Sequence, residues 1–307
     1  MKERIDFRKN LTEILGSNNQ LDSRQLASLS DLPRKEIVSF KEAWIKTPEE
    51  RRRQIISHLV KLQSEDYRLD FTGVFLVCLE DGDEDIRSQA IIGLDREEDS
   101  SIITPLIRLV KEDKSEKVRA AAAVALGQFA LLAAVKKLSP AQSAEIYSTL
   151  LTIIEDITET SEVKRLCLEA IAPLDSPRVR ELITRSYNSE DVKVKASALY
   201  AMGRNCDIAW LPIIIKEKDN DESEIRYEVV ESCGELGMEE AVPTLIELAE
   251  DKDINVRKAS IIALEQIGGT KSKQALSRLL NSPHDDVRKA AQETLAELEI
   301  FTGLFDP

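Results

Sequence analysis

Apolar residues recur along most of the chain with the period of an amphipathic α-helix. After Val194, apolar or small residues follow at four, seven and eight positions, at Ala198, Ala201 and Met202, which form one stripe of a helix. Six other segments carry the same stripe, and each of the seven opens with Val or Ile followed by Arg or Lys. The opening residues are Ile86, Val118, Val163, Val194, Ile225, Val256 and Val287. The pattern therefore predicts seven helices of one kind.

These helices recur at a nearly constant interval. The last five openings are 31 residues apart, and the first two are 32 apart. One gap of 45 residues, between Val118 and Val163, predicts an insertion near residues 131–144. A fixed period of this length is typical of repeat proteins, in which one unit cannot bury its apolar face alone and stacks on its neighbours.

A second helix precedes each of the seven. Pro105, Pro212 and Pro243 stand thirteen residues before an opening residue and are followed by apolar runs. Proline is tolerated in the first turn of a helix, where its missing N–H has no intrahelical acceptor. Each repeat is therefore predicted to be a helical hairpin, with helix A at the proline and helix B at the Val-Arg segment.

Two runs of sequence carry a family resemblance. Asp253 to Leu264, and Val118 to Gly127, resemble the second helix of HEAT repeats, specifically the short HEAT-like repeats of the phycobilisome-lyase type. The resemblance covers about residues 70 to 298. It implies an all-α fold, a right-handed α-solenoid (superhelix) of stacked HEAT-like helical hairpins, and a role as a protein-binding scaffold.

The two ends differ from the repeats, so we expect three regions: an N-terminal helical cap over 1–65, the solenoid over 66–298 and an apolar C-terminal tail over 299–307. In the cap, Thr47 to Glu50 reads as a capping box that starts a helix, after an earlier helix from Pro33 to Trp44. We interpret Arg51 to Arg53 as a solvated face of this cap. The tail either folds onto the last helix or binds a partner.

Charge and composition narrow the partners. The 307 residues carry 42 Lys and Arg against 56 Asp and Glu, a net charge of −14, with 42% hydrophobic residues. This describes a folded protein whose surface repels phosphates, so we expect no nucleic acid as a partner. The longest apolar stretch, Ala120 to Val135, falls short of the roughly 18 residues of a membrane span. The charged start, Met1 to Asp6, does not resemble an export signal, so we expect no membrane and a cytoplasmic location.

The chain offers little for imidazole-based or metal chemistry. His58 and His284 are its only histidines, and its four cysteines are widely spaced, so we expect no metal site, no cofactor and buried free thiols. Deoxyhypusine hydroxylases, which are also built of HEAT-like repeats, hold iron with His-Glu pairs that are missing from this sequence. A bilin-lyase-like or chaperone-like accessory enzyme, acting on a cofactor-carrying protein, remains the alternative to a non-enzymatic scaffold.

A basic residue directly follows the opening Val or Ile in all seven segments. Acidic residues precede each one, so we expect a structural ladder of ion pairs between adjacent repeats rather than a phosphate-binding track. The ladder residues are Arg87, Arg119, Lys164, Lys195, Arg226, Arg257 and Arg288.

The binding hypothesis rests on helical geometry. Positions two and six residues after each opening point away from the apolar stripe, and B helices line the concave face of HEAT-type solenoids. Apolar, tyrosine and charged residues mix there, as in protein-binding surfaces, although some of them could instead pack against neighbouring repeats. The proposed concave-face residues are Ile92, Val124, Arg165, Glu169, Tyr200, Tyr227, Glu231, Lys258 and Ile262. We therefore expect an unknown protein or peptide to bind there, with Tyr200 and Tyr227 at the centre.

Overall fold

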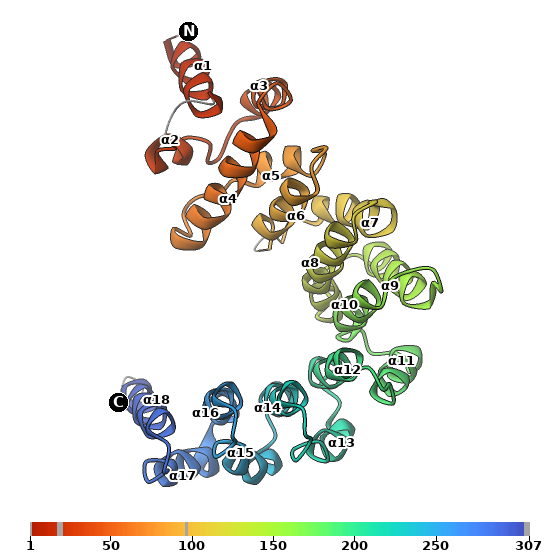
Figure 1. Cartoon of the computed structure of the whole chain (residues 1–307), viewed down its shortest axis with the longest axis vertical. Helices are drawn as coiled ribbons and strands as arrows, with labels where there is room; N and C mark the ends of the chain where they lie inside the picture. The colour runs from red at the N-terminus through yellow and green to blue at the C-terminus, as the bar shows by residue number, and fades with distance from the viewer. Residues whose placement is uncertain (1, 17–20, 96–97, 304–307) are drawn as a thin grey trace. The chain divides into compact units, whose positions relative to one another are not determined.

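The fold is entirely helical over the residues that the computed structural model describes. Their backbone covers 2–16, 21–95 and 98–303, and side chains are described for all of these except 2–6 and 299–303. Within these ranges the chain forms eighteen α-helices and three short 3-10 helices, without a strand (Figure 1). This confirms the all-α solenoid. The apolar C-terminal tail over 299–307 lies outside the described side chains.

Two compact units divide the chain, Met1–Ile153 and Ile154–Pro307. Their border falls inside helix α9, Pro140–Glu155. We refer to them as unit 1 and unit 2 and describe each by itself.

Unit 1 contains the cap and the first two predicted hairpins. Its helices before α9 are α1 (Lys2–Leu15), α2 (Ser23–Ala27), α3 (Arg34–Trp44), α4 (Glu49–Glu65), α5 (Thr72–Cys78), α6 (Glu84–Gly93), the 3-10 helix η1 (Ser100–Ile102), α7 (Ile103–Glu112) and α8 (Glu116–Ala134). Helix α6 packs against both α4 and α8, while α3 packs against both α1 and α5. The cap therefore continues both rows of helices.

Unit 2 consists of stacked hairpins. Its helices after α9 are α10 (Ser161–Ile171), α11 (Pro177–Tyr187), α12 (Val192–Arg204), η2 (Ile208–Trp210), α13 (Leu211–Ile215), α14 (Ser223–Leu236), η3 (Glu239–Ala241), α15 (Val242–Leu248), α16 (Ile254–Ile267), α17 (Gly269–Leu279) and α18 (Asp285–Gly303). Figure 1 shows α12, α14, α16 and α18 in one row and α11, α13, α15 and α17 in a second row, within this unit.

Every predicted opening residue lies in a B helix, and the B helices are α6, α8, α10, α12, α14, α16 and α18. Pro212 and Pro243 lie in the first turns of α13 and α15, as expected. The region of the predicted insertion contains no additional element. Its residues lengthen α8 to 19 residues and α9 to 16 residues.

The apolar stripe of each B helix forms the core, and small residues let helices approach closely. Val118, Ala122 and Leu126 of α8 are completely buried. A Cβ atom at Gly93 of α6 would lie 2.4 Å from the ring of Phe75 in α5, so only glycine fits there. Among the described helices, α8 alone is long and apolar enough to span a membrane. Its packing against α6 and α7 is that of a core helix.

Two local predictions were wrong. Thr47 does not cap α4, because Pro48 is the N-cap residue and the Thr47 hydroxyl donates to the carbonyl of Ala43. The cysteines are not all buried either: Cys206 is exposed in the turn after α12, where its φ is +55°. A turn closed immediately after the helix leaves this side chain outside the stripe.

Candidate functional site

The arginines that directly follow the opening residues of the B-helix segments make a recurring contact. Arg87 Nη1 donates to the carbonyls of Asp81 and Gly82, six and five residues earlier, at 2.9 and 3.1 Å. Its other nitrogens form a bidentate pair with Asp113 of the next hairpin, with both distances at 2.7 Å. One side chain therefore closes its own hairpin loop and joins the next one.

The same arrangement recurs in unit 2. Arg226 donates to the carbonyls of Asn220 and Asp221 and pairs bidentately with Asp251 at 2.7 and 2.8 Å. Arg257 likewise donates to the carbonyl of Asp251. Further contacts of the ladder residues are Arg257 with Asp286, Lys195 with Glu217, Arg288 with Asp285, and Arg119 with the carbonyl of Asp113. Lys164 lies near Asp156, whose pKa is lowered by hydrogen bonds from Thr158 and then by this charge.

The carboxylates that pair with these bases are mostly not the ones expected from the sequence. Asp191 and Asp253, which precede the bases, cap their own helices by accepting backbone N–H groups. Asp83 does this too and also pairs with Arg53. Burial alone would raise the pKa of Asp251, but the hydrogen bonds from Arg226 and from the Asp253 N–H lower it overall. For Arg87, Arg226 and Arg257 the paired carboxylate comes from the adjacent hairpin, which spacing alone did not reveal, whereas Arg288 pairs with Asp285 of its own helix.

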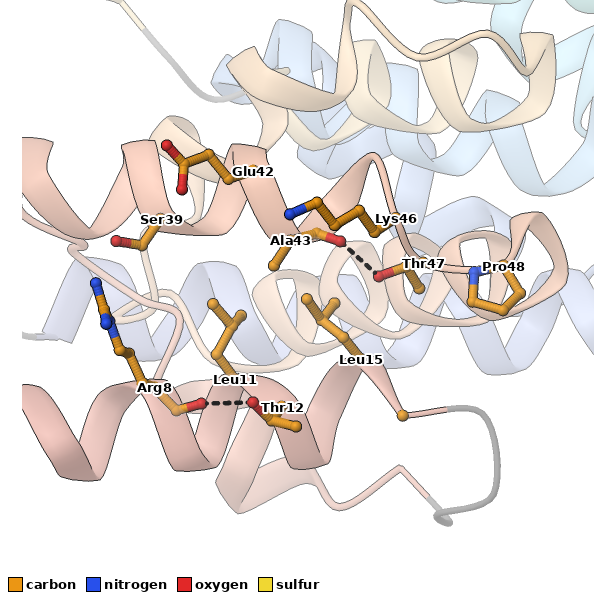
Figure 2. Close-up of a pocket in the computed structure, with 11 residues that line it drawn as sticks. Arg8, Leu11, Thr12, Leu15, Ser39, Glu42, Ala43, Lys46, Thr47 and Pro48 are labelled. Atoms are coloured by element: carbon orange, nitrogen blue, oxygen red, sulfur yellow. Dashed lines mark hydrogen bonds between the residues drawn. The ribbon is translucent and has the colours of Figure 1, made fainter.

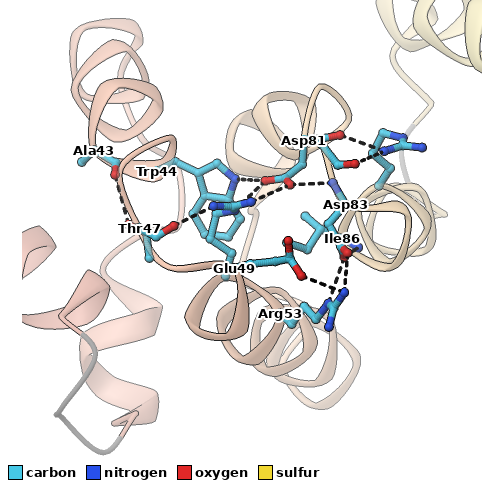
Figure 3. Close-up of polar contacts among 11 residues, drawn as sticks. Ala43, Trp44, Thr47, Glu49, Arg53, Asp81, Asp83 and Ile86 are labelled. Atoms are coloured by element: carbon cyan, nitrogen blue, oxygen red, sulfur yellow. Dashed lines mark hydrogen bonds and ion pairs between the residues drawn. The ribbon is translucent and has the colours of Figure 1, made fainter.

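The cap contains a further copy of this contact (Figure 3). Arg52 Nη1 donates to the Thr47 carbonyl at 2.6 Å, and Arg52 Nη2 donates to Asp81 at 3.1 Å. Trp44 Nε1 donates to the same carboxylate at 2.7 Å. The interpretation of Arg51 to Arg53 as a solvated face was therefore wrong. Arg51 is 5% exposed and donates to the carbonyl of Ile14 at 2.9 Å.

The predicted concave-face residues divide between the two units. Ile92 and Val124 belong to unit 1, on the neighbouring helices α6 and α8, and are 48% and 53% exposed. The other seven belong to unit 2: Arg165 and Glu169 on α10, Tyr200 on α12, Tyr227 and Glu231 on α14, and Lys258 and Ile262 on α16. The exposed face of these B helices is thus apolar as well as charged.

Not every position on the predicted face is exposed. Ser88 and Ala196, two residues after their opening residues, are buried, because neighbouring B helices pack closely enough to cover them. Ile262, six residues after its opening residue, is 52% exposed. The later of the two positions is therefore the one that faces solvent most consistently.

Helices α12 and α14 pack closely against each other. Ser232 Oγ of α14 donates to the Leu199 carbonyl of α12 at 2.7 Å. A Cβ atom at Gly203 would lie 2.8 Å from the Cα atom of Ser232, so the absence of a side chain permits this contact. The close approach brings Tyr200 of α12 beside the exposed side of α14.

Carboxylates surround both tyrosines, each of which is 36% exposed. Burial and the charges of Glu169, Glu235 and Glu228 raise the pKa of Tyr200, against the lowering effect of Arg204. Burial, a hydrogen bond to Glu231 and the charge of Glu228 raise the pKa of Tyr227. We call Tyr200, Tyr227, Glu228, Glu231 and Glu169 the tyrosine face.

Glu228 is the residue of this face that sequence reasoning missed. Its Oε2 atom is buried and has no hydrogen-bond partner in the structure. Burial, followed by the charges of Glu169, Glu231 and Glu224, raises the pKa of Glu228 to about 8. No sequence signal marks it, because it stands three residues after its opening residue, off the apolar stripe.

Comparison with known proteins gives the family. The model of HEAT repeats matches residues 73–146 and 209–296, more than half of the chain. The chain belongs to the HEAT-repeat family. This confirms the resemblance drawn from the Val-Arg segments. No curated relative matches this HEAT-repeat chain.

Solved structures share the fold at low sequence identity. The complex of CpcE and CpcF of phycocyanin lyase from Nostoc sp. PCC7120 is 15% identical with a TM-score of 0.57, covering 92% of this chain and 97% of that one. An importin beta structure is 14% identical with a TM-score of 0.48, covering 95% and 44%. Human deoxyhypusine hydroxylase is 17% identical with a TM-score of 0.35, covering 97% and 98%. The likeness to the lyase shows a shared helical-repeat fold, and the other two are too low to support an argument.

A cavity of about 640 Å³ lies in the cap of this HEAT-repeat chain, between α1 and α3 (Figure 2). Arg8, Lys46 and Ser39 line it together with Leu11. Two of its hydroxyl groups already donate within their own helices, Thr12 to the Arg8 carbonyl and Thr47 to the Ala43 carbonyl. These two hydroxyl groups are therefore already engaged within the cap.

The two histidines contact residues outside the tyrosine face. His58 Nδ1 is 2.8 Å from the Gln54 carbonyl, and His284 Nε2 is 3.7 Å from Glu250. Within the described part of the chain, no three His, Cys, Asp or Glu side chains gather as metal ligands would. Burial raises the pKa of the Cys78 and Cys233 thiols, which favours the unreactive protonated form.

Proposed function

We propose that this HEAT-repeat chain is a non-enzymatic scaffold that binds a protein or peptide on its B helices, and that in unit 2 the binding surface is the tyrosine face. The observation that supports this most is the pair of half-exposed rings, Tyr200 and Tyr227, on helices packed in direct contact. Solvated ridges of surface helices are normally charged, whereas aromatic side chains are enriched at the centres of protein interfaces.

Tyrosine suits such a role for physical reasons. Its ring offers a large contact area with few rotatable bonds, and its hydroxyl can still reach a polar partner. Ile262 on α16 extends the apolar area, since it is 52% exposed on the same row of helices. The surrounding carboxylates supply a charged rim around these residues, as protein interfaces commonly have.

Replacing both rings tests the proposal. Immobilised Y200A/Y227A protein should lose the partner that wild-type protein captures from native cell extract, because each interface hot spot contributes on the order of 2 kcal/mol. The Y67A variant is the matched control, since Tyr67 is 86% exposed in unit 1. Y200F/Y227F keeps the rings and should keep the partner.

Thermal unfolding of the same variants separates binding from packing. We expect Y200A/Y227A to melt only a few degrees below wild type, because both residues lie off the buried stripe. If the double variant melts far lower and still captures its partner, the tyrosines are packing residues. The binding surface would then lie on the A helices, on the lengthened helices α8 and α9 or on the cap.

An accessory enzyme acting on a cofactor-carrying protein is the second candidate. Its support is the fold shared with the phycocyanin lyase complex over nearly the whole of both chains. Such an enzyme would hold a tetrapyrrole during transfer. A shift in the absorbance spectrum of a bilin on addition of the purified chain would favour this candidate, and an unchanged spectrum would favour the scaffold.

A further inference from the structure

The tyrosine face has an excess of negative charge. The two cations nearest to it are already engaged: Arg204 pairs with Glu235 at 3.3 Å, and Arg165 pairs with Glu162 and Glu169. Three carboxylates, Glu169, Glu231 and Glu224, raise the pKa of Glu228 together with its burial. The face therefore places carboxylates beside aromatic rings without a matching number of cations.

Glu228 lies at the centre of this arrangement. Its charge raises the pKa of both tyrosines, which belong to two helices in direct contact. Its buried Oε2 atom has no hydrogen-bond partner among the residues that the structure describes. A negative charge on Glu228 is unfavourable because of its burial and the neighbouring carboxylates, and a cation bound beside it would offset that cost.

We propose that the tyrosine face binds a basic protein segment by receiving a lysine or arginine side chain beside Glu228 and against the rings of Tyr200 and Tyr227. This rests on the proposed function, to which it adds the chemistry of the partner. A cation is attracted both to carboxylates and to the face of an aromatic ring. The net charge of −14 would also steer a basic partner toward this chain.

The proposal has a consequence for pH. A cation binds the ionised form of Glu228, whereas at neutral pH most Glu228 is protonated, so binding releases a proton and strengthens as pH rises through about 8. Electrostatic effects connect Glu228 with Glu169 on α10, Tyr200 on α12, and Glu224, Tyr227 and Glu231 on α14 itself; the two helices packed against α14 also carry Arg204 on α12 and Lys258 on α16. Of these, only Glu169, Glu231 and Glu224 affect its pKa, and all three act in the same direction as burial.

Two defined peptides test the charge preference. A short fluorescein-labelled peptide of repeated Lys-Gly-Leu should bind the wild-type chain at least about tenfold more tightly than its Glu-Gly-Leu counterpart at low salt. Its affinity should rise about tenfold between about pH 6.5 and about pH 8.5, because the ionised fraction of Glu228 rises over that range. Equal affinity for the two peptides would overturn the proposal.

Variants locate the effect. E228Q should weaken the basic peptide about tenfold at about pH 8.5 and remove the pH dependence. E181Q is the matched control, because it removes the same charge from α11, in the A-helix row of unit 2. It should leave both the peptide affinity and its pH dependence unchanged. Calorimetry in two buffers of different ionisation enthalpy should detect proton release for wild type but not for E228Q. Equal effects of the two variants would show that net charge alone attracts the peptide.

The outcomes separate this inference from the proposed function. If Y200A/Y227A loses its captured partner but the wild-type chain shows no preference for the basic peptide, the scaffold role stands and the basic partner does not. If the basic peptide binds through Glu228 while Y200A/Y227A captures its partner normally, the cation site stands and the assignment of that partner to this face fails.

Discussion

The buried ion pair between Arg226 and Asp251 gives the sharpest test of how the hairpins are held together. The two side chains are 4% and 8% exposed and make two hydrogen bonds with each other. Arg226 also donates to the carbonyls of Asn220 and Asp221. Arg226→Ala would remove all of these donors and leave a buried carboxylate with only the Asp253 N–H beside it.

The magnitude follows from this burial. Removing one partner of a buried ion pair costs about 3 kcal/mol, because the remaining charge stays desolvated. Arg288 is the matched control: it occupies the same position in the last repeat, but its side chain is 40% exposed and that of its partner Asp285 is 91% exposed. Arg288→Ala should cost about 1 kcal/mol, since exposed pairs contribute little.

Urea unfolding followed by far-ultraviolet circular dichroism measures the difference. The two variants should differ by about 2 kcal/mol in free energy of unfolding, or by about 4–8 °C in melting temperature for a unit of this size. Arg226→Lys should fall between wild type and Arg226→Ala, because lysine keeps the charge but not the bidentate geometry. Equal losses for Arg226→Ala and Arg288→Ala would refute the idea that the ladder stabilises the fold through burial.

Two further variants probe the contact between α12 and α14. Glu228 has a pKa of about 8 in the folded chain, above its ordinary value of 4.5, so its stabilising contribution is complete below about pH 4.5 and is lost as pH rises through 8. The free energy of unfolding of E228Q should therefore exceed that of wild type by about 2 kcal/mol or more at about pH 8.5, but not at about pH 4.5. E224Q, on the exposed first turn of α14, should show no such trend. Gly203→Ala should lower the free energy of unfolding by about 1–2 kcal/mol, because the new Cβ atom would lie 2.8 Å from the Ser232 backbone. Gly82→Ala is the control: its Cβ atom would have no atom within 4 Å, so thermal unfolding should change little.

The sequence by itself determined the repeat and most of its core. Seven opening residues at a steady interval predicted seven B helices, and all seven are found. This prediction succeeds because the spacing of apolar residues in an amphipathic helix identifies the face that is buried, and similar hairpins stack by packing these faces together. Tyr200 and Tyr227 could be placed on the exposed side of adjacent helices for the same reason.

One residue, Arg51, prevented the sequence pattern from revealing a further repeat in the cap. In α4, Arg51 occupies the position of the Val or Ile that opens the apolar stripe of each B helix, although Ile55 and Leu59, four and eight residues later, are completely buried as the stripe requires. The Ile14 carbonyl accepts a hydrogen bond from Arg51 and makes its burial possible. A search by residue type could not find a repeat whose first core position is satisfied by a contact with another helix.

Only the tertiary structure decided which charges pair and which carboxylate is buried. Arg87 and Arg226 pair with Asp113 and Asp251, which lie about 25 residues away along the chain and come close only when hairpins stack. The pKa of Glu228 on α14 is raised by burial and then by Glu169, which stands on α10 and lies 59 residues earlier in the chain. A helix's own period fixes which of its faces is apolar, but charge pairing and desolvation depend on separations in space, which no local pattern encodes.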